Sequence, residues 1–416
     1  MPDEELHCSF CGKSRREVGH MVKGARAYIC DGCIMKAIKV VDAQKAEAAK
    51  DDITELVPPP EIRAFLDEYV IGQERAKKFL SVAVFNHYMR LYDARKDLMD
   101  DTEIEKSNIM MLGPTGCGKT LLAKTVARFL NVPFTIADAT TLTEAGFVGD
   151  DVEDIISSLV MASGGDIRRA ERGIVFIDEI DKIGRKGTSS NMVRDVRGEG
   201  VQQALLKLIE GSTVSVPMPG HRRLGGGERF EIDTTNILFI VSGAFVGLDE
   251  VISKRVNKKS SVGFGGRVGK GDKVDGESDL LNLVTTEDLK GYGFIPEFLG
   301  RIPLTVALRE LTEDELVQIL TEPRNAIVKQ YQKQFEIGAD VELTFTDDSL
   351  RAIAQRAIKE GRGARGLRSI VGPMLMDLMY ELPANRGKYG EVVVTKAVVD
   401  GEEEPELVER KNEATG

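Results

Sequence analysis

The sequence predicts an α/β protein in which helices cover a parallel sheet, with a small domain before it and a small helical domain after it. Three observations favour this fold. Helix and strand patterns alternate between residue 61 and about residue 308. Four of the five cysteines form two close pairs near the N-terminus. After residue 309, apolar side chains recur at helical spacing, as in Leu316, Ile319 and Leu320. The boundaries that we predict for the domains, the linker and the charged tail are 1–41, 42–60, 61–308, 309–400 and 401–416.

The two cysteine pairs are Cys8-x-x-Cys11 and Cys30-x-x-Cys33, with eighteen residues between them. This spacing is typical of a structural zinc site with four thiolate ligands. A segment of about 40 residues cannot bury enough apolar surface to fold alone, so the metal would supply much of the folding energy. We therefore predict that Zn²⁺ binds these four cysteines. Two disulfides are the alternative, which a cytoplasmic location disfavours.

The linker is rich in Ala, Lys, Glu and Asp and ends in Pro58-Pro59-Pro60. Three prolines cannot continue a helix. We therefore expect the zinc module to be flexibly attached to the α/β domain.

A glycine-rich loop follows the apolar strand predicted at Asn108–Leu112 and precedes an apolar-faced helix. It fits the phosphate-loop pattern G-x-x-x-x-G-K-[ST] at every specified position. In such loops the lysine, here Lys119, reaches the β- and γ-phosphates, and the hydroxyl of Thr120 binds Mg²⁺. The residues that we expect at the nucleotide are Gly113, Pro114, Thr115, Gly116, Cys117, Gly118, Lys119, Thr120 and Leu121.

A second motif, Ile174-Val175-Phe176-Ile177-Asp178-Glu179, ends an unbroken apolar run with two carboxylates. Such a run predicts a strand buried on both faces, and ligands of open α/β sheets bind at the carboxyl ends of their strands. We expect Asp178 to hold Mg²⁺ and Glu179 to orient and deprotonate the attacking water. The alternative is a strand-end turn with two solvated acids.

Other predicted strands of the α/β domain are Phe134–Ala137, Asn236–Val241 and Ile302–Val306. The insertions 217–227 and 253–279 break the pattern and are rich in glycine, and we expect the longer one to be mobile. The small domain ends in a strand at Glu391–Val394, and we expect the tail to be disordered.

Composition excludes some classes of function. Hydrophobic residues make up 42% and charged residues 30% of the chain, as in globular proteins. The formal net charge of −11 argues against a general nucleic-acid binder. No apolar run reaches the roughly 18 residues of a membrane span, and the acidic start Met1–Glu5 is no secretory signal. We expect a cytoplasmic protein that contacts neither membrane nor nucleic acid.

The zinc module, the phosphate loop, the Asp-Glu strand and the helical small domain together resemble the ClpX family of AAA+ unfoldases, which feed proteins to the ClpP peptidase. The resemblance runs from Cys8 to about Ile370 and more loosely beyond. Its most specific stretches are Leu142–Gly146, Gly200–Gly211, Ile295–Phe298 and Gly363–Ile370.

The resemblance implies roles for three further residues. Ile71, in Val70-Ile71-Gly72-Gln73, matches an apolar contact to adenine; a plain helix start is the alternative. Arg301 matches an arginine finger, which reaches the γ-phosphate of a neighbouring subunit and so requires a ring. Its alternative is a structural salt bridge. Arg365 matches the family's sensor arginine, although Arg362 and Arg368 lie near it in sequence.

Three loops match family loops that handle substrate and partner. The pore loop would be Gly146, Phe147, Val148 and Gly149, with Phe147 where the family usually has tyrosine. A basic loop at the pore entrance would be His221, Arg222 and Arg223, in an order that differs from the family's. The peptidase-docking tripeptide would be Val262, Gly263 and Phe264. An aromatic plug in the core and two ordinary solvated loops are the respective alternatives.

The resemblance therefore implies an ATP-driven protein unfoldase and translocase that works as a homo-hexamer, with Glu179, Lys119 and Arg301 as catalytic residues. Its cofactors would be ATP, Mg²⁺ and Zn²⁺. Its partners would be the ClpP peptidase, together with protein substrates and adaptors recruited through the zinc module. The chain carries no convincing protease site, so proteolysis would come from the partner. Two alternatives are a remodelling chaperone that needs no peptidase and a zinc-containing nucleic-acid motor.

Overall fold

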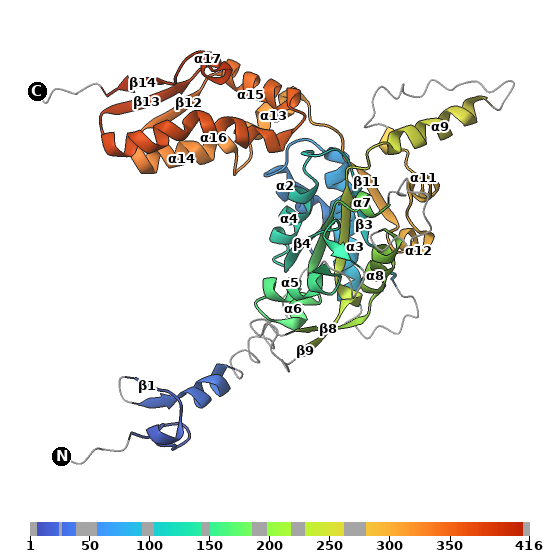
Figure 1. Ribbon diagram of the computed structural model, residues 1–416, viewed down its shortest axis with the longest axis vertical. Coiled ribbons are helices and arrows are strands. Elements are labelled where there is room, and N and C mark those ends of the chain that lie inside the picture. Colours follow the sequence, from blue (N-terminus) through green and yellow to red (C-terminus); the bar gives the residue numbers. More distant parts are fainter. Residues whose placement is uncertain are drawn as a thin grey trace, which may run out of the picture. The chain divides into compact units, whose positions relative to one another are not determined.

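The computed structural model describes residues 6–24, 27–38, 56–93, 104–143, 150–184, 198–217, 229–261 and 280–410 (Figure 1). The chain divides into two compact units, Met1–Leu56 and Val57–Gly416. The first carries the cysteine pairs. The second carries the α/β sheet and the helical C-terminal segment.

The N-terminal unit is built around a short antiparallel strand pair, β1 (Met21–Lys23) and β2 (Tyr28–Cys30). A 3₁₀ turn, η1 (Arg15–Glu17), precedes the strands, and residues 31–38 form a helix directly after them. Cys30 thus ends a strand and Cys33 lies in the first turn of a helix, so the second cysteine pair spans a strand-to-helix junction.

The centre of the larger unit is a five-stranded, wholly parallel sheet in the order β11-β3-β10-β7-β4. Every residue of β3 and β10 is buried, which explains why their sequences are apolar without alternation. These five strands are the five that the sequence predicts, with ends that shift by one or two residues. Their bounds are β3 (Ile109–Leu112), β4 (Phe134–Asp138), β7 (Ile174–Asp178), β10 (Leu238–Gly243) and β11 (Leu304–Ala307).

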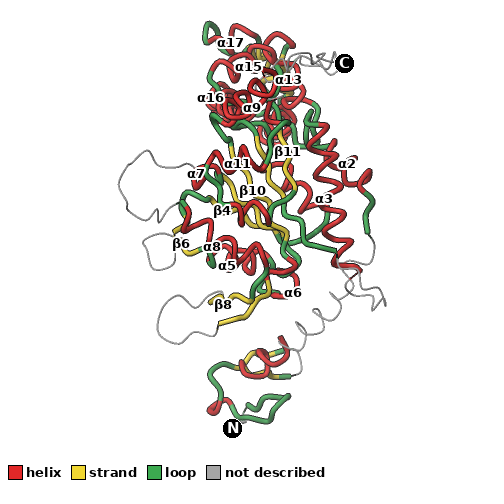
Figure 2. The backbone as a smooth tube through the Cα atoms, turned by 90° about the vertical axis from the view of Figure 1, so that its right-hand side faces the viewer, coloured by secondary structure: helices red, strands yellow, loops and turns green. Residues whose placement is uncertain are grey.

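Helices cover both faces of this sheet. On one side α2 packs against α3 and α4, and on the other α7 and α8 lie against the strands (Figure 2). This division follows from right-handed crossovers, because the chain leaves β3 toward β4 and then returns across the sheet. The bounds are α2 (Pro59–Asp67), α3 (Glu74–Asp93), α4 (Lys119–Phe129), α5 (Asp154–Ala162), α6 (Ile167–Ala170), α7 (Asp181–Gly184), α8 (Glu199–Glu210), α9 (Leu248–Ser261), α11 (Thr286–Tyr292) and α12 (Pro296–Gly300).

Two of these helices begin or continue where the sequence suggested irregular chain. Helix α2 starts at Pro59, inside the predicted linker, because proline is tolerated in the first helical turn. Helix α9 continues to Ser261, so the first residues of the predicted mobile insertion are helical.

The α/β domain also contains short strand pairs outside the central sheet. Strands β5 (Leu142–Thr143) and β6 (Asp150–Asp151) pair in parallel. Strands β8 (Thr213–Pro217) and β9 (Arg229–Asp233) form an antiparallel pair that leads into the 3₁₀ turn η3 (Thr234–Asn236). The sequence did not predict these pairs, since two- to five-residue strands carry little periodicity.

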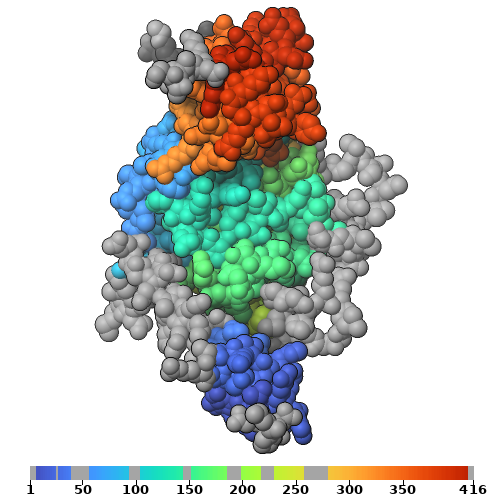
Figure 3. All heavy atoms as spheres, turned by 90° about the vertical axis from the view of Figure 1, so that its left-hand side faces the viewer, coloured from blue at the N-terminus to red at the C-terminus, as the bar shows by residue number. Residues whose placement is uncertain are grey.

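The C-terminal segment has its own hydrophobic core, which runs from Leu316 to Val399, and it forms a distinct lobe in the space-filling view (Figure 3). Its helices are α13 (Glu313–Thr321), α14 (Ile327–Ala339), α15 (Asp347–Lys359), α16 (Ala364–Glu381), η4 (Leu382–Asn385) and α17 (Lys396–Asp400). Its strands form a sheet in the order β12 (Glu342–Phe345), β13 (Tyr389–Val394) and β14 (Glu406–Glu409).

The prediction of a disordered tail from residue 401 is wrong for its first part. Strand β14 pairs antiparallel with β13, and Leu407 packs against the core of the small domain. The side chain of Arg410 donates a hydrogen bond to the backbone carbonyl of Asp340 at 2.6 Å. A single apolar residue and one arginine anchor a segment whose composition looks like that of a solvated tail.

Among the described residues, no helix has both the length and the apolar character that a membrane crossing requires.

Candidate functional site

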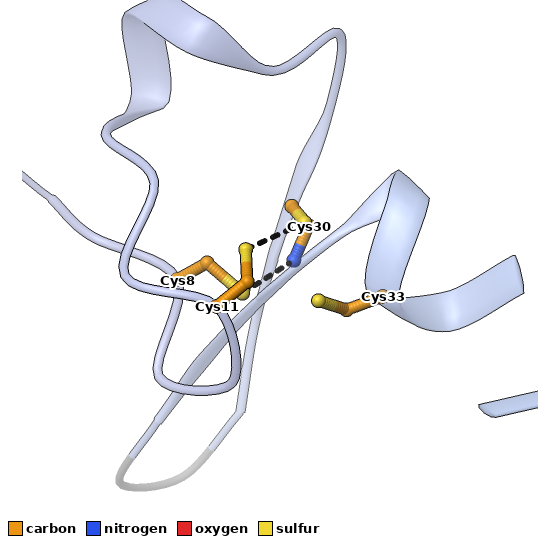
Figure 4. A group of neighbouring side chains, drawn as sticks. All are labelled: Cys8, Cys11, Cys30 and Cys33. Atoms are coloured by element: carbon orange, nitrogen blue, oxygen red, sulfur yellow. Dashed lines mark hydrogen bonds between the residues drawn. The ribbon is translucent and has the colours of Figure 1, made fainter. Parts of the chain in front are cut away.

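The four paired cysteines meet at one point, with their sulfur atoms directed toward one another (Figure 4). All four Sγ atoms lie within 4.8 Å of one another, and those of Cys11 and Cys30 are 3.6 Å apart. Zinc–sulfur bonds of about 2.3 Å in a tetrahedron require sulfur atoms roughly 3.8 Å apart, whereas a disulfide requires about 2.0 Å. The geometry fits a four-thiolate zinc site and excludes a disulfide between Cys11 and Cys30.

The surroundings of Cys8 favour a thiolate. Burial alone would raise its pKa, but backbone amides of Cys30, Phe10 and Cys11 lower the pKa of the Cys8 thiol to about 6. The amide of Cys30 donates to the Cys8 sulfur at 3.3 Å. Because zinc binds the deprotonated sulfur, these amides prepare the site for the metal.

The phosphate loop joins β3 to α4. Helix α4 begins at Lys119, so the loop lies at a helix N-terminus, where unpaired amides and the helix dipole attract anions. Gly116 has a φ of 81°, and a Cβ there would lie 2.7 Å from the backbone oxygen of Arg362. Glycine is therefore required both for the turn and for the close approach of the small domain.

Asp178 is the centre of the cluster at the end of β7. The hydroxyl of Ser242 donates to its Oδ1 at 2.6 Å, and the hydroxyl of Thr120 donates to its Oδ2 at 3.4 Å. Lys119, which directly precedes Thr120 in the chain, is buried. Its Nζ donates to the carbonyls of Gly113 and Pro114. A carboxylate and a hydroxyl side by side at the phosphate loop form a donor set that suits Mg²⁺.

Glu179 is exposed and has a φ of 55°, in the left-handed region that non-glycine residues rarely occupy. Strain of this kind costs about 1–3 kcal/mol and concentrates at functional sites. The turn sends the Glu179 side chain into solvent beside Asp178, whose Oδ1 accepts the Glu179 amide at 3.0 Å. An exposed carboxylate next to the phosphate loop is positioned to act on water.

Arg365 connects the small domain to this cluster. It lies in the first turn of α16, and its guanidinium is 4.0 Å from Oδ2 of Asp178. The two neighbouring arginines have other partners in the structure: Arg362 pairs with Glu360, and Arg368 bonds to Gln330. Of the three candidates, Arg365 is the one whose guanidinium lies near Asp178.

A cavity of about 340 Å³ opens between the phosphate loop, the segment that joins the two domains and the small domain. Its lining includes Gly116, Leu311 and Gly363, which come from each of these three parts. Ile71 is half-buried and does not line this cavity, so its predicted contact with adenine stays a prediction.

Arg301 follows α12 and is exposed, with its guanidinium 2.8 Å from a carboxylate oxygen of Glu210. The buried amide of Asn108 holds the backbone of Arg301, since its Nδ2 donates to the Arg301 carbonyl at 2.8 Å. The salt bridge that was the alternative for Arg301 is thus present. It is exposed on both sides, and such pairs contribute little stability, so Glu210 leaves Arg301 able to exchange partners.

The three substrate and partner loops, Gly146–Gly149, His221–Arg223 and Val262–Phe264, lie outside the described residues. Their roles therefore stay predictions.

Cys117, in the phosphate loop, is among the described residues. Burial raises the pKa of its thiol, which keeps the thiol protonated.

Sequence reasoning missed the residues that orient this site. It assigned no role to Ser242, Asn108 or Glu210. Asn108 begins a predicted strand and Glu210 ends helix α8, and neither position signals its partner Arg301, which lies 193 residues from Asn108 and 91 residues from Glu210. These pairings come from the fold.

Comparisons with known proteins agree with this geometry. Residues 6–43 match a model of the ClpX C4-type zinc finger, residues 104–305 match an AAA domain of the Cdc48 subfamily, and residues 311–394 match the C-terminal D2-small domain of ClpB. The ATP-dependent Clp protease ATP-binding subunit ClpX of Treponema denticola is 48% identical over 403 residues, which cover 97% of this chain and 96% of that protein. With its zinc-finger cysteines, phosphate loop and Asp-Glu strand in place, the chain belongs to the ClpX family of AAA ATPases.

Proposed function

We propose that this ATPase is a protein unfoldase and translocase that works as a ring of six copies and threads protein substrates into the ClpP peptidase. The observation that carries the proposal is the meeting of Thr120, Ser242 and Arg365 at Asp178. It joins the phosphate loop, the central sheet and the small domain at one carboxylate, so a change at the phosphates acts on both domains.

In this proposal each residue of the cluster has one task in ATP hydrolysis. The loop amides and Lys119 bind the phosphates, while Thr120 and Asp178 hold Mg²⁺, which would neutralise phosphate charge when bound. Glu179 accepts the proton of the attacking water, and its exposed position leaves room for that water. Arg365 supplies positive charge from the small domain of the same chain.

The features of Arg301 support the proposal that the chain forms a ring. An arginine finger completes a site from a neighbouring subunit, and Arg301 is exposed, held at its backbone by Asn108 and paired only with the exposed Glu210 among the described residues. Arginine fingers contribute roughly 10³- to 10⁵-fold in rate where they act. We therefore assign the complete active site to two adjacent subunits.

Phe147 would grip the substrate in the pore, and His221, Arg222 and Arg223 would attract acidic substrate ends at its entrance. The zinc module would recruit substrates and adaptors. Val262, Gly263 and Phe264 would dock to the peptidase, because two apolar residues in an otherwise polar stretch of sequence suit an apolar pocket on a partner.

The test is degradation of a stably folded, tagged fluorescent protein by the purified chain together with ClpP and ATP. We expect loss of fluorescence with the wild type and none with Glu179→Gln, which removes the general base. Phe264→Ala should abolish degradation while ATP hydrolysis continues.

Two other outcomes would change the proposal. Unchanged degradation with Phe264→Ala would discard the docking assignment and keep the unfoldase. ATP hydrolysis by the wild type without any degradation would favour a remodelling chaperone that needs no peptidase, which is the second candidate function.

A further inference from the structure

Residues 308–312, which we call the hinge segment, connect the sheet to the small domain. The segment leaves β11 after Ala307 and enters α13 at Glu313. Leu308 continues the sheet, because its amide donates to the carbonyl of Leu112 at 2.7 Å. Thr312 is the N-cap of α13. Between these two fixed points, Arg309, Glu310 and Leu311 have no regular secondary structure.

Gln73 binds the hinge segment through its side-chain amide. Its Nε2 donates to the carbonyl of Arg309 at 2.7 Å, and its Oε1 accepts the Arg309 amide at 3.2 Å. The same Nε2 donates to the carbonyl of Cys117 in the phosphate loop at 3.2 Å. One side chain therefore binds both backbone groups of a hinge residue and one backbone group of the phosphate loop.

The burial and backbone conformation of Gln73 hold its side chain in this contact. The residue is 4% exposed, and its φ of 57° is unusual for a residue with a side chain. Gly72 before it has a φ of 64°, and a Cβ there would overlap Oε1 of Glu315. A strained, close-packed backbone thus carries the Gln73 amide to the hinge segment, which is the kind of strain that accompanies function.

Arg309 links the hinge segment to the small domain. Its guanidinium binds Glu315 through two hydrogen bonds, of 2.7 Å from Nη1 and 2.5 Å from Nη2. Glu315 also accepts the amide of Thr312 at 3.0 Å and completes a capping box at the start of α13. The chain of contacts runs from the phosphate loop through Gln73 and Arg309 to the first turn of the small domain.

We propose that Gln73 is a positioning residue that couples the phosphate loop to the hinge segment, so that occupancy of the phosphate site sets the orientation of the small domain. This inference rests on the proposed function, in which ATP binding and hydrolysis move the two domains. Gln73 touches neither phosphate nor water in this role. It acts through the Cys117 carbonyl on one side and the Arg309 backbone on the other.

The opposing interpretation is that Gln73 merely satisfies buried backbone groups. The chain offers a matched control for it in Gln202, a glutamine that is 1% exposed. Its Nε2 donates to the carbonyls of Ile183 and Gly293, and its Oε1 accepts the amide of Ile295. Gln202 has as many hydrogen bonds as Gln73, but none of them reaches the hinge segment.

The experiment compares wild type, Gln73→Met and Gln202→Met in hydrogen exchange of the peptide that contains residues 308–312, with and without ATP. We expect ATP to change exchange at this peptide in the wild type and in Gln202→Met, and to leave it unchanged in Gln73→Met. The number of substrate molecules unfolded per ATP hydrolysed should fall about tenfold in Gln73→Met, because one of the lost hydrogen bonds, to the Cys117 carbonyl, makes the link to the phosphate loop. The KM for ATP should stay within about threefold, because the phosphate contacts remain.

The inference would be overturned if ATP changed hydrogen exchange of the hinge peptide in Gln73→Met as much as in the wild type, and if the number of substrate molecules unfolded per ATP were also unchanged. If Gln73→Met does not fold, Gln73→Asn replaces it, because asparagine tolerates the left-handed backbone but is one methylene too short to bridge both carbonyls. Failure of the wild type itself to unfold substrate would refute the proposed function, while the exchange of the hinge peptide would still decide the role of Gln73.

Discussion

Asp178 shows how single residues are oriented at this site. Its two carboxylate oxygens accept from hydroxyls on different elements, Ser242 at the end of β10 and Thr120 in α4. Ser242 is fully buried, and its bond is the shorter of the two. The carboxylate is therefore fixed before any metal binds, which removes a reorganisation cost from the reaction.

This arrangement predicts the effect of Ser242→Ala. A hydrogen bond to a charged group contributes about 1.5–3 kcal/mol, so kcat for ATP hydrolysis should fall roughly tenfold to a hundredfold. The Mg²⁺ concentration needed for half-maximal rate should rise. Steady-state ATPase measurements at several Mg²⁺ concentrations would show this.

Ser349→Ala is the matched control. Ser349 is equally buried, and its hydroxyl donates to the carbonyl of Thr346 at the other end of α15 from the cavity. It should lower stability without changing the Mg²⁺ dependence. An equal loss of rate in both variants would mean that Ser242 acts on folding alone.

At the scale of elements, the zinc module and the sheet are stabilised in different ways. The central strands are held by apolar burial on both faces, and β3 and β10 need no ligand. The N-terminal unit has two three-residue strands and a short helix, with few buried side chains. Its stability must come from the metal.

A zinc chelator should therefore unfold one unit and leave the other intact. In the full chain, we expect hydrogen exchange to become fast in residues 6–38 and to stay slow in β3, β7 and β10. ATP hydrolysis without substrate should stay within about twofold, because every residue of the nucleotide site lies in the larger unit.

Two cysteine variants provide a control for the chelator experiment. Cys30→Ser should lose the zinc, and Cys117→Ser should keep it, because the fifth cysteine lies in the phosphate loop. Metal content measured on the two purified variants decides this. Zinc retention by Cys30→Ser would contradict the four-thiolate site.

At the scale of the whole molecule, the proposal implies that one chain contributes residues to two different active sites. The cluster at Asp178 includes a residue of its own small domain, Arg365, whereas Arg301 projects from the far end of α12 and binds Glu210. If Arg301 completes a neighbour's site, a chain that lacks Glu179 still offers a working Arg301 to the next subunit.

Mixing two inactive variants tests this sharing. Arg301→Ala and Glu179→Gln alone should each lose at least 10²-fold in ATP hydrolysis. Mixed and allowed to reassemble, they should recover part of the rate, since some sites then combine Glu179 from one chain with Arg301 from the other. A rate equal to the sum of the separate variants would place Arg301 in its own chain's chemistry or in structure.

Most of the larger elements and the chemistry that they carry could be predicted from the sequence alone. All five strands of the central sheet could be predicted, and the three inner ones, β3, β7 and β10, stand out as apolar runs, because a strand buried on both faces leaves a local record. The phosphate loop, the Asp178-Glu179 pair and the two cysteine pairs could be predicted because their residues are close in the chain and their spacing is fixed by the ligand.

Which residues meet across long sequence separations could be learned only from the folded structure. Gln73 reaches Cys117 and Arg309, and Asn108 reaches Arg301, across separations that leave no local pattern. The ordered strand β14 was missed for the same reason, since its stability comes from β13 and from the packing of Leu407. Contacts between residues far apart in sequence depend on how the domains pack, and packing is a property of the whole fold.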